Sequence, residues 1–337
     1  MTTDFPIAVI GAGPVGLFAV FQAGMLGMRA VVIDALEAPG GQCVALYPEK
    51  PIYDIPAQPS ITGGGLIDNL LRQVEPFAPE FRLGQSVESL EPVPAGWRLV
   101  TSTGAAVTAG AVVIAAGVGA FGPKRPPLAG IEAFEGQSVF YCVSRRAEFA
   151  GKRVVIAGGG DSAVDWALSL SEIAASVMVV HRRPKFRAAP DSLTKMQALA
   201  AEGRIELVVP YQLHGLEGQG GRLEAVEVIG DDGAIRRLGA DILLPFFGLS
   251  QNLGPIRDWG IGVSAEGIAV RQQDCATGRP GIYAVGDIAA YPGKLKLILT
   301  GFAEAAAAVH AARRHLHPDE AMHFTHSTSK GVPVLAA

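Results

Sequence analysis

The sequence predicts an α/β protein of two domains, each built around a parallel β-sheet. The chain has 337 residues, which is more than one hydrophobic core ordinarily serves. An apolar run, a glycine-rich turn, a helical stretch and a second apolar run follow one another near the N-terminus, and the same order recurs in the middle of the chain. Strands that alternate with helices in this way are typical of parallel sheets.

The composition indicates a globular protein without a nucleic-acid partner. Hydrophobic residues make up 49% of the chain and charged residues 18%, and the net charge is only −4. The cysteines Cys43, Cys142 and Cys275 lie far apart, so neither a disulfide framework nor a metal site is expected. We therefore expect a cytoplasmic location.

Residues 5–28 are uncharged and long enough to span a bilayer. Asp4 stands where a secretory signal would carry basic residues, and turn-forming glycines interrupt the segment. A buried strand followed by a buried helix explains the same hydrophobicity. No membrane association is expected.

The first glycine motif opens a nucleotide-binding unit. An apolar run at 7–10 leads into Gly11-x-Gly13-x-x-Gly16. In such a motif the first glycine permits the tight turn, the second lets a pyrophosphate approach the backbone, and the third lets helix and strand pack closely. The following helix offers free N–H groups and a positive dipole end to the phosphates. This pattern predicts a Rossmann-like domain.

The second motif repeats this device. An apolar run at 154–157 is followed by small residues at the same offsets, namely Gly158, Gly160 and Ala163. The residues expected to face a nucleotide here are Gly158, Gly160, Asp161 and Ser162. Two such units in one chain imply two bound nucleotides.

The two copies differ at the end of their second strand. Asp34 lies 23 residues after Gly11, where a carboxylate can accept hydrogen bonds from ribose hydroxyls. His181 lies 23 residues after Gly158, in the same register. Asp34 suits an unphosphorylated ribose, which fits the adenosine end of FAD.

A cluster of cations follows His181. Arg182, Arg183 and Arg187 offer guanidinium groups that can pair with a ribose 2′-phosphate, which a carboxylate would repel. The second unit is therefore predicted to bind NADP(H). The alternative is a solvated basic face, the usual fate of a charge run. A pyridine nucleotide beside a flavin implies hydride transfer between them.

Other stretches carry candidate flavin contacts. Gln42 follows a Gly-Gly pair and would bring an amide near the flavin ring, and Tyr47 could stack on the ring or be an ordinary half-buried tyrosine. Residues 82–90 are predicted to form a strand that places Val87 near the adenine. Asp287 follows a late apolar strand and either holds ribityl hydroxyls or caps a turn. A helix is predicted to start near Thr300 or Gly301 and to point at the flavin.

The cysteine pattern limits the chemistry. Flavin enzymes of this build often pass electrons to a dithiol, either C-x4-C beside the flavin or C-x-x-C ahead of the second glycine motif. Pro48 stands at the second position of the first pair, and Cys142 is alone in the second region. No internal disulfide relay can operate, so the flavin must pass electrons to an acceptor outside the chain.

Several stretches together carry a resemblance that extends over nearly the whole chain. They are the two glycine motifs, GGQCVALYPEKPIYDIP, GGGDSAVDWA, HRRPKFR, GDIAAYPGKLKL and HSTS. This combination resembles ferredoxin–NADP⁺ reductases of the thioredoxin-reductase-like type. The resemblance implies two Rossmann-like domains of the three-layer ββα type, with FAD bound by residues 1–119 and 250–337 and NADPH by residues 120–249.

The resemblance also implies a homodimer and several site residues. Tyr47 would stack on one face of the flavin, and His326 would cover the other face from the partner subunit, with Thr328 beside it. Phe121 matches a further FAD contact, as do Asp34, Gln42, Val87 and Asp287. The implied activity is electron transfer between NADPH and ferredoxin or flavodoxin, by hydride transfer to flavin N5 followed by one-electron steps.

An acidic ferredoxin would need a basic docking patch. Candidates for it are Lys124, Arg125, Arg145, Arg146, Lys152 and Arg153. The alternatives to a ferredoxin reductase are a flavin enzyme of the same fold that acts on a quinone, a ferric chelate or another small redox protein, and a redox sensor without catalytic activity.

Overall fold

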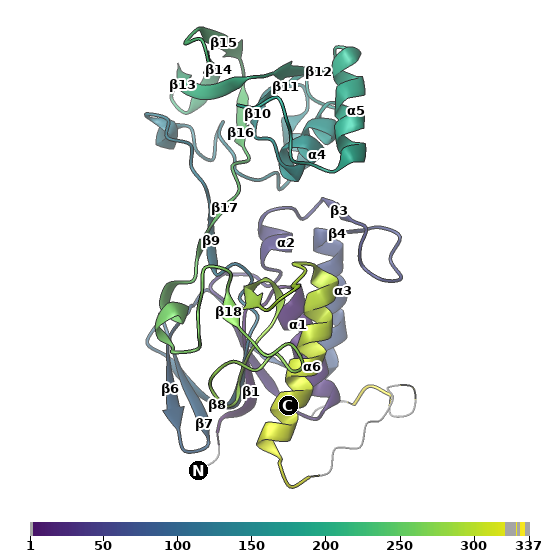
Figure 1. Ribbon diagram of the computed structural model, residues 1–337, viewed down its shortest axis with the longest axis vertical. Coiled ribbons are helices and arrows are strands. Elements are labelled where there is room, and N and C mark those ends of the chain that lie inside the picture. Colours follow the sequence, from purple (N-terminus) through teal and green to yellow (C-terminus); the bar gives the residue numbers. More distant parts are fainter. Residues whose placement is uncertain (1–2, 321–327, 329–330, 334–337) are drawn as a thin grey trace. The chain divides into compact units, whose positions relative to one another are not determined.

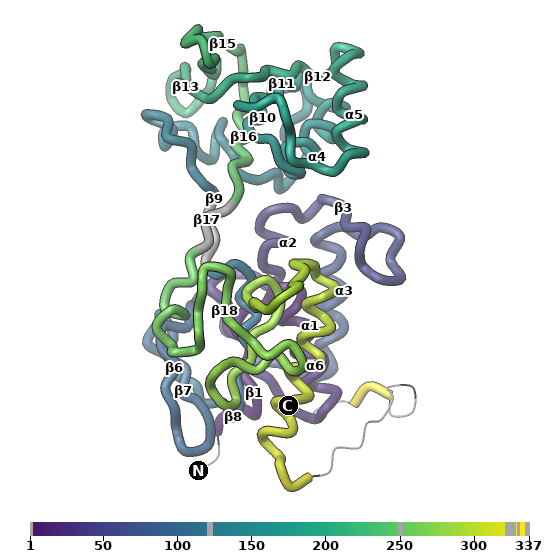
Figure 2. Tube along the Cα trace, viewed as in Figure 1, coloured from purple at the N-terminus to yellow at the C-terminus, as the bar shows by residue number. Residues whose placement is uncertain are grey.

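The chain folds into two compact units, which are described one at a time (Figure 1). The structure is a computed structural model that describes residues 3–320, 328 and 331–333, and for residues 120–123 and 249–251 it gives only the course of the backbone. The first unit comprises Met1–Phe121 and Gln251–Ala337, and the second comprises Gly122–Ser250. The chain enters the second unit once and returns once (Figure 2). The connecting segments β9 (Ala120–Pro123) and β17 (Leu249–Asn252) pair with each other.

The first unit contains a parallel sheet in the order β5-β2-β1-β8-β19. Its strands are β1 (Phe5–Ile10), β2 (Ala30–Ile33), β5 (Glu80–Arg82), β8 (Ala106–Ile114) and β19 (Ile282–Ala284). β1, β2 and the second half of β8 are almost wholly buried, in keeping with their runs of valine, isoleucine and alanine.

β8 carries both the parallel and the antiparallel pairing of one seven-stranded sheet. Its last residues pair in parallel with β1 and β19, and its first residues pair in antiparallel with β7 (Gly96–Thr101), which in turn pairs with β6 (Val87–Val93). The antiparallel strands thus form a separate layer that is attached through one long strand.

Helices cover the face of the parallel sheet opposite to that layer. Figure 1 shows α1 (Pro14–Met25), α3 (Gly63–Val74) and α6 (Ile298–Leu316) side by side. Ile7 and Val9 pack toward α1 and α6, while Ala8 and Ile10 face the antiparallel strands. This alternation divides the core into two clusters and gives the three layers that the sequence predicts.

Short elements complete the first unit. They are α2 (Gln42–Ala45), β3 (Pro51–Ile52), β4 (Ile61–Thr62), β18 (Ile268–Ala269), β20 (Ala289–Ala290) and the 3₁₀ helices η1 (Glu75–Phe77), η4 (Gly254–Asp258) and η5 (Gly286–Ile288).

The second unit repeats the design on a smaller scale. Its parallel sheet has the order β12-β11-β10-β16, and its antiparallel layer has the order β13-β14-β15. The helices α4 and α5 pack on the other face. The bounds are β10 (Arg153–Ala157), α4 (Asp161–Leu170), β11 (Ser176–Val180), α5 (Pro190–Ala201), β12 (Ile205–Val208), β13 (Tyr211–Gln219), β14 (Arg222–Gly230), β15 (Ile235–Gly239) and β16 (Ile242–Pro245), with the 3₁₀ helices η2 (Ile131–Ala133) and η3 (Arg146–Phe149).

One expectation about local structure is wrong. The predicted strand at 82–90 is divided, because β5 ends at Arg82 and β6 begins at Val87, with a turn through Gly84 between them. The last long helix begins at Ile298, close to the predicted start near Thr300 or Gly301. The apolar segment at 5–28 forms a strand and a helix, as predicted.

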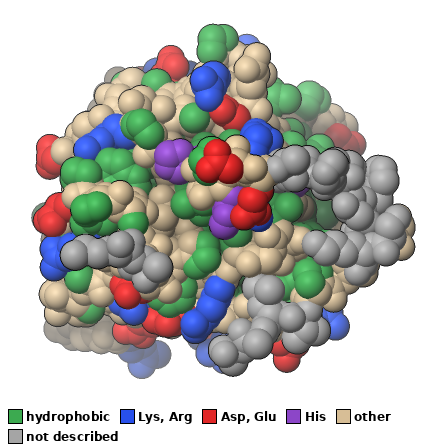
Figure 3. All heavy atoms as spheres, turned by 90° about the horizontal axis from the view of Figure 1, so that it is seen from below, with side chains coloured by type: hydrophobic (Ala, Val, Ile, Leu, Met, Phe, Trp, Pro, Cys, Tyr) green, Lys and Arg blue, Asp and Glu red, His purple; other side chains and the backbone are tan. Residues whose placement is uncertain are grey.

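Neither unit offers a bilayer-spanning segment among its described residues. None of the helices found there combines the length and the apolar character that crossing a membrane requires. On the face drawn in Figure 3, acidic, basic and histidine side chains are interspersed with hydrophobic ones. This mixed surface agrees with the small net charge of the sequence.

Candidate functional site

Two backbone hydrogen bonds hold the glycine turn in the same way in both units. One ties the turn to the end of the second strand, and the other ties it to the loop beyond that strand. In the first unit they are Gly11 N–H to Ile33 O and Gly40 N–H to Ala12 O, both at 2.8 Å. In the second they are Gly158 N–H to Val180 O at 3.0 Å and Arg187 N–H to Gly159 O at 2.6 Å. Each partner in the second unit lies 147 residues after its counterpart.

The helices that follow both turns begin at equivalent glycines. Gly13 is the N-cap of α1 and Gly160 is the N-cap of α4, and neither helix receives a hydrogen bond from a capping side chain. The first N–H groups of both helices are therefore available to a ligand, and the positive end of each helix dipole favours an anion there.

The three glycines of the first motif meet different surroundings. Gly11 has φ +106°, and a Cβ built on it would lie 2.4 Å from Ala115 O. A Cβ on Gly16 would lie 1.9 Å from Gly11 O, so helix and turn pack too closely for a side chain. A Cβ on Gly13 would meet only Gly41 Cα, at 3.9 Å. The protein thus leaves space above Gly13, where a pyrophosphate fits.

A cavity of about 390 Å³ opens above this turn in the first unit. It lies at the carboxyl ends of β1, β2 and β8, which is where ligands bind in open parallel sheets. Seven of the residues predicted from the sequence line it: Gly11, Gly13, Asp34, Gln42, Tyr47, Val87 and Asp287.

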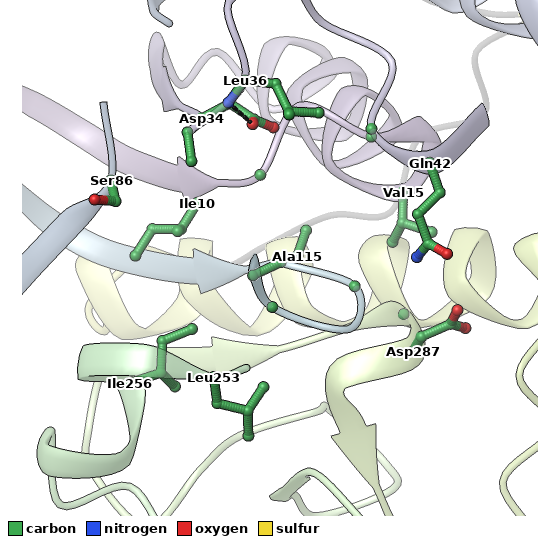
Figure 4. A pocket seen from close by; sticks show the side chains of 18 of the residues that line it. Ile10, Val15, Asp34, Leu36, Gln42, Ser86, Ala115, Leu253, Ile256 and Asp287 are labelled. Carbon is green, nitrogen blue, oxygen red and sulfur yellow. Dashed lines mark hydrogen bonds between the residues drawn. The ribbon is translucent and has the colours of Figure 1, made fainter. Parts of the chain in front are cut away.

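The polar lining residues lie at two ends of the cavity (Figure 4). Asp34 and Ser86 lie at one end, and Gln42 and Asp287 lie at the other, with Ala115 between them. An elongated ligand can therefore place a ribose at the first end and a polar ring system at the second. A dinucleotide such as FAD has this shape.

Asp34 is fixed by the backbone around it. Its Oδ2 accepts the N–H of Ala12 at 2.5 Å, and its Oδ1 accepts the N–H of Leu36 at 2.8 Å. Burial raises the pKa of Asp34, and these two hydrogen bonds act in the opposite direction. Each carboxylate oxygen retains a lone pair for a ribose hydroxyl.

Tyr47 and Asp287 share the other end of the cavity with a thiol. The hydroxyl of Tyr47 lies 3.6 Å from Cys43 Sγ, and burial raises the pKa of both groups. Burial also raises the pKa of Asp287, while the charges of Lys296 and Lys294 lower it. The thiol and the phenol are therefore neutral, hydrogen-bonding groups at neutral pH.

Four predicted residues lie elsewhere or outside the described part of the chain. Gly16 lies behind the turn rather than in the cavity. Thr328 is exposed and does not line the cavity. The side chain of Phe121 and the whole of His326 lie outside the described residues.

Several residues that line the cavity were not predicted from the sequence. They are Cys43, Gln85, Ser86, Ala115–Gly117, Asn252–Ile256, Trp259 and Lys296–Ile298. Ala115–Gly117 follow the carboxyl end of a predicted strand, and such a position could have indicated a ligand-binding residue. Asn252–Ile256 return from the second unit, and no pattern in that stretch of sequence marks them.

In the second unit, His181 lies against the glycine turn. A Cβ on Gly159 would lie 2.3–2.6 Å from atoms of the His181 ring, and the ring centroid lies 4.9 Å from that of Phe186. The pKa of His181 is lowered by burial and by the charges of Arg182, Arg183 and Arg187, although a hydrogen bond to the backbone of Lys185 raises it. The free protein therefore holds a neutral imidazole at neutral pH.

The three arginines beside His181 are exposed. Within the described residues, Arg182, Arg183 and Arg187 form no ion pair with a carboxylate. Unpaired guanidinium groups at the end of a nucleotide-binding strand suit a ribose 2′-phosphate.

Two other predicted residues of this unit lie at the start of α4. Asp161 Oδ1 accepts the N–H of Ala189 at 2.9 Å, and Ser162 is exposed. The carboxylate of Asp161 thus fixes the loop beyond β11, and Gly158 and Gly160 form the turn itself.

Unlike Arg182, Arg183 and Arg187, the arginines expected to dock an acidic partner form ion pairs within the described part of the chain. Arg125 pairs with Glu132 and Glu135, and the other three pairs are Arg145 with Glu148, Arg146 with Glu172, and Arg153 with Asp241. Each of these four arginines thus shares its charge with a carboxylate, whereas the expected docking patch, which also includes Lys124 and Lys152, stays a prediction.

The chain matches a family model over most of its length. Residues 5–314 match the model described as Pyridine nucleotide-disulphide oxidoreductase. The Ferredoxin–NADP reductase of Rhodospirillum rubrum is 65% identical over 98% of this chain and 97% of its own. The Ferredoxin–NADP reductase of Granulibacter bethesdensis is 60% identical over 98% of this chain and 95% of its own.

Solved structures share the fold at lower identity. The thioredoxin reductase of T. acidophilum has a TM-score of 0.79 at 23% identity, with 93% of this chain and 98% of that chain covered. The Lactococcus lactis thioredoxin reductase has a TM-score of 0.77 at 24% identity, with 93% and 99% covered. These likenesses confirm the predicted fold of two Rossmann-like domains.

Proposed function

The chain belongs to the pyridine nucleotide-disulphide oxidoreductase family and, within it, to the ferredoxin–NADP⁺ reductases of the thioredoxin-reductase-like type, and from this premise we propose that it transfers electrons between NADPH and ferredoxin or flavodoxin. It is an oxidoreductase that uses FAD and NADP(H). The acceptor protein, the assignment of each nucleotide to a unit and the role of each residue belong to the proposal.

One observation carries the assignment of the two nucleotides. The two glycine turns have the same hydrogen bonds, yet the first ends at Asp34 and the second at His181, beside three arginines that form no ion pair with the carboxylates described. A carboxylate accepts ribose hydroxyls, whereas guanidinium groups bind a phosphate dianion. FAD therefore belongs in the cavity of the first unit, and NADPH belongs at the turn of the second unit.

The residues of the cavity hold and orient the flavin. The open space above Gly13 and the first N–H groups of α1 accept the pyrophosphate, and Asp34 accepts the ribose hydroxyls. Gln42 and Asp287 offer hydrogen bonds at the opposite end, and Tyr47 offers an aromatic face. FAD, when bound, accepts a hydride from NADPH and gives up electrons singly. The protein supplies the geometry and excludes water.

With Tyr47 against one face of the flavin, a second residue is needed to cover the opposite face. The resemblance assigns that face to His326, with Thr328 beside it, contributed by the partner subunit of a homodimer. We expect truncation before His326 to change turnover more than FAD content, since Asp34 and the Gly13 turn remain intact. Unchanged ferredoxin reduction by the truncated protein would exclude this role.

A set of assays tests the activity. The purified protein should show a flavin spectrum, NADPH should bleach it faster than NADH does, and addition of ferredoxin should support sustained reduction of cytochrome c. A reduced enzyme that reacts faster with a quinone or a ferric chelate than with ferredoxin or flavodoxin would overturn the choice of acceptor. A colourless protein would overturn the proposed function itself.

A further inference from the structure

A buried ion pair lies directly beneath the turn that carries Asp287. Glu304, on α6, is 6% exposed, and the side chain of Lys294 is 7% exposed. Glu304 is the one charged residue among the buried polar residues in the described part of the chain. Isolated buried charges are costly, so a pair placed here needs compensating contacts.

Three donors surround the carboxylate of Glu304. Its Oε2 accepts the backbone N–H of Gly286 at 2.7 Å, and its Oε1 accepts the hydroxyl of Tyr291 at 2.5 Å. Lys294 Nζ donates to the same Oε1. The carboxylate thus connects α6 to the loop that follows β19, and one of its bonds is made to the residue before Asp287.

The Gly286 turn has no room to relax around this contact. Gly286 has φ +75°, a left-handed conformation that a glycine adopts freely. A Cβ on Gly301 would lie 2.4 Å from Val15 Cγ2 and 3.4 Å from Gly286 Cα. The turn therefore packs closely against both α6 and the first turn of α1. Glu304 fixes the direction of the Gly286 N–H group.

The pair also places charge near the cavity. The charges of Lys294 and Glu304 both act on the Asp287 carboxyl, in opposite directions. The pair has no formal net charge, so its effect at this end of the cavity is smaller than that of either group alone. Loss of one partner would leave an uncompensated charge in a region of low dielectric constant, where electrostatic effects are large.

We propose that Glu304 and Lys294 are positioning residues of the FAD site, which hold the Gly286–Asp287 turn against the flavin and, as a pair, add no net charge at that end of the cavity. The proposal rests on the assignment of FAD to this cavity. Neither side chain is among the residues that line the cavity, so both act through the turn and through their charge.

Four variants separate this role from a purely structural one. Glu304→Gln keeps an acceptor for Gly286 but leaves the cation of Lys294 unpaired, and Lys294→Met leaves the opposite charge. The double variant E304Q/K294M is neutral again. Tyr291→Phe removes one donor without changing any charge. The matched control is Glu320→Gln, which removes an exposed ion pair with Arg313 at the far end of α6.

The flavin midpoint potential and the FAD dissociation constant are the readouts. A cation stabilises the reduced anionic flavin, so Glu304→Gln should raise the potential and Lys294→Met should lower it, with the double variant near the wild type. Tyr291→Phe should weaken FAD binding about 3- to 10-fold, the usual range for one hydrogen bond, at an unchanged potential. Glu320→Gln should change neither quantity.

The outcomes distinguish this inference from the function on which it rests. Wild-type protein that binds no FAD would overturn both. Wild-type protein that binds FAD, with potentials that stay constant or move in the same direction in the two single variants, would overturn only the inference. If a single variant does not fold, Tyr291→Phe still decides, because unaltered FAD affinity in that variant would count against positioning.

Discussion

Asp34 and His181 occupy equivalent positions, yet they interact with the glycine turn in different ways. Asp34 accepts the N–H of Ala12, whereas the His181 ring lies over Gly159 and makes a side chain there impossible. Asp34 itself can bind ribose hydroxyls. His181 covers the glycine turn, and the arginines beside it are the groups that can bind a 2′-phosphate. We therefore expect substitutions of single side chains at these positions to change which nucleotide is bound.

Arg183→Ala should weaken NADPH binding about 10- to 100-fold, because a hydrogen bond to a charged group contributes roughly 1.5–3 kcal/mol. NADH lacks the 2′-phosphate, so its binding should change little. The measurement is the KM for each coenzyme in a flavin reduction assay. Arg237→Ala, which removes an arginine paired with Glu217 in the same unit, is the control and should alter neither value.

His181 should make NADPH binding depend on pH. Burial and the neighbouring arginines lower the pKa of His181 in the free protein, and a bound phosphate dianion raises it. Binding therefore takes up a proton between these two pKa values, and affinity should fall as the pH rises through that window. Titration calorimetry should show proton uptake that His181→Gln abolishes. Equal proton uptake with NADH would contradict an effect of the 2′-phosphate charge on His181.

At the scale of elements, two glycines of the first turn are expected to affect different properties: Gly13 affects nucleotide binding, and Gly16 affects folding stability. Gly13 has φ −72° and open space above it, so Gly13→Ala should leave the free energy of unfolding almost unchanged and still block the pyrophosphate. Gly16→Ala would place a Cβ 1.9 Å from Gly11 O and should destabilise the first unit itself. Urea unfolding of the apoprotein and FAD titration distinguish the two variants. Equal destabilisation by both would contradict this division.

The strands of both parallel sheets could be predicted because they are buried on both faces. The runs at 30–33 and 154–157 are continuous apolar stretches, and the structure places β2 and most of β10 there. The stretch at 82–90 is predicted as one strand, but a turn through Gly84 and Gln85 separates β5 and β6, which lie at opposite ends of the strand order β5-β2-β1-β8-β7-β6. Turns of this kind depend on tertiary contacts and leave a weak signal in the sequence.

Side chains that reach the cavity from distant loops could not be predicted. Asn252 reaches the cavity beside its bridge partner Gly119, and Trp259 donates its indole N–H to Glu88 O at 3.3 Å, so both depend on contacts between residues far apart in the chain. The ion pairs of Arg125 with Glu132 and of Arg146 with Glu172 could not be predicted either, because neither carboxylate is adjacent in sequence to its arginine. A charge run in a sequence therefore does not reveal which cations remain unpaired.

At the scale of the whole molecule, the two nucleotide sites should bind independently. Each unit has its own core clusters and its own glycine turn. Residues without shared partners usually contribute additively, within about 0.3–0.5 kcal/mol. The double variant Gly13→Ala/Arg183→Ala should therefore lose FAD affinity as Gly13→Ala does and NADPH affinity as Arg183→Ala does, in calorimetric titrations. A coupling beyond that range would show that the sites communicate.

The constant spacing of 147 residues between matched hydrogen bonds has a consequence for coenzyme preference. Equal spacing means that the two turns share their backbone contacts while the side chains after each second strand differ. An exchange of those side chains between the two turns should therefore be able to change coenzyme preference without disturbing the backbone.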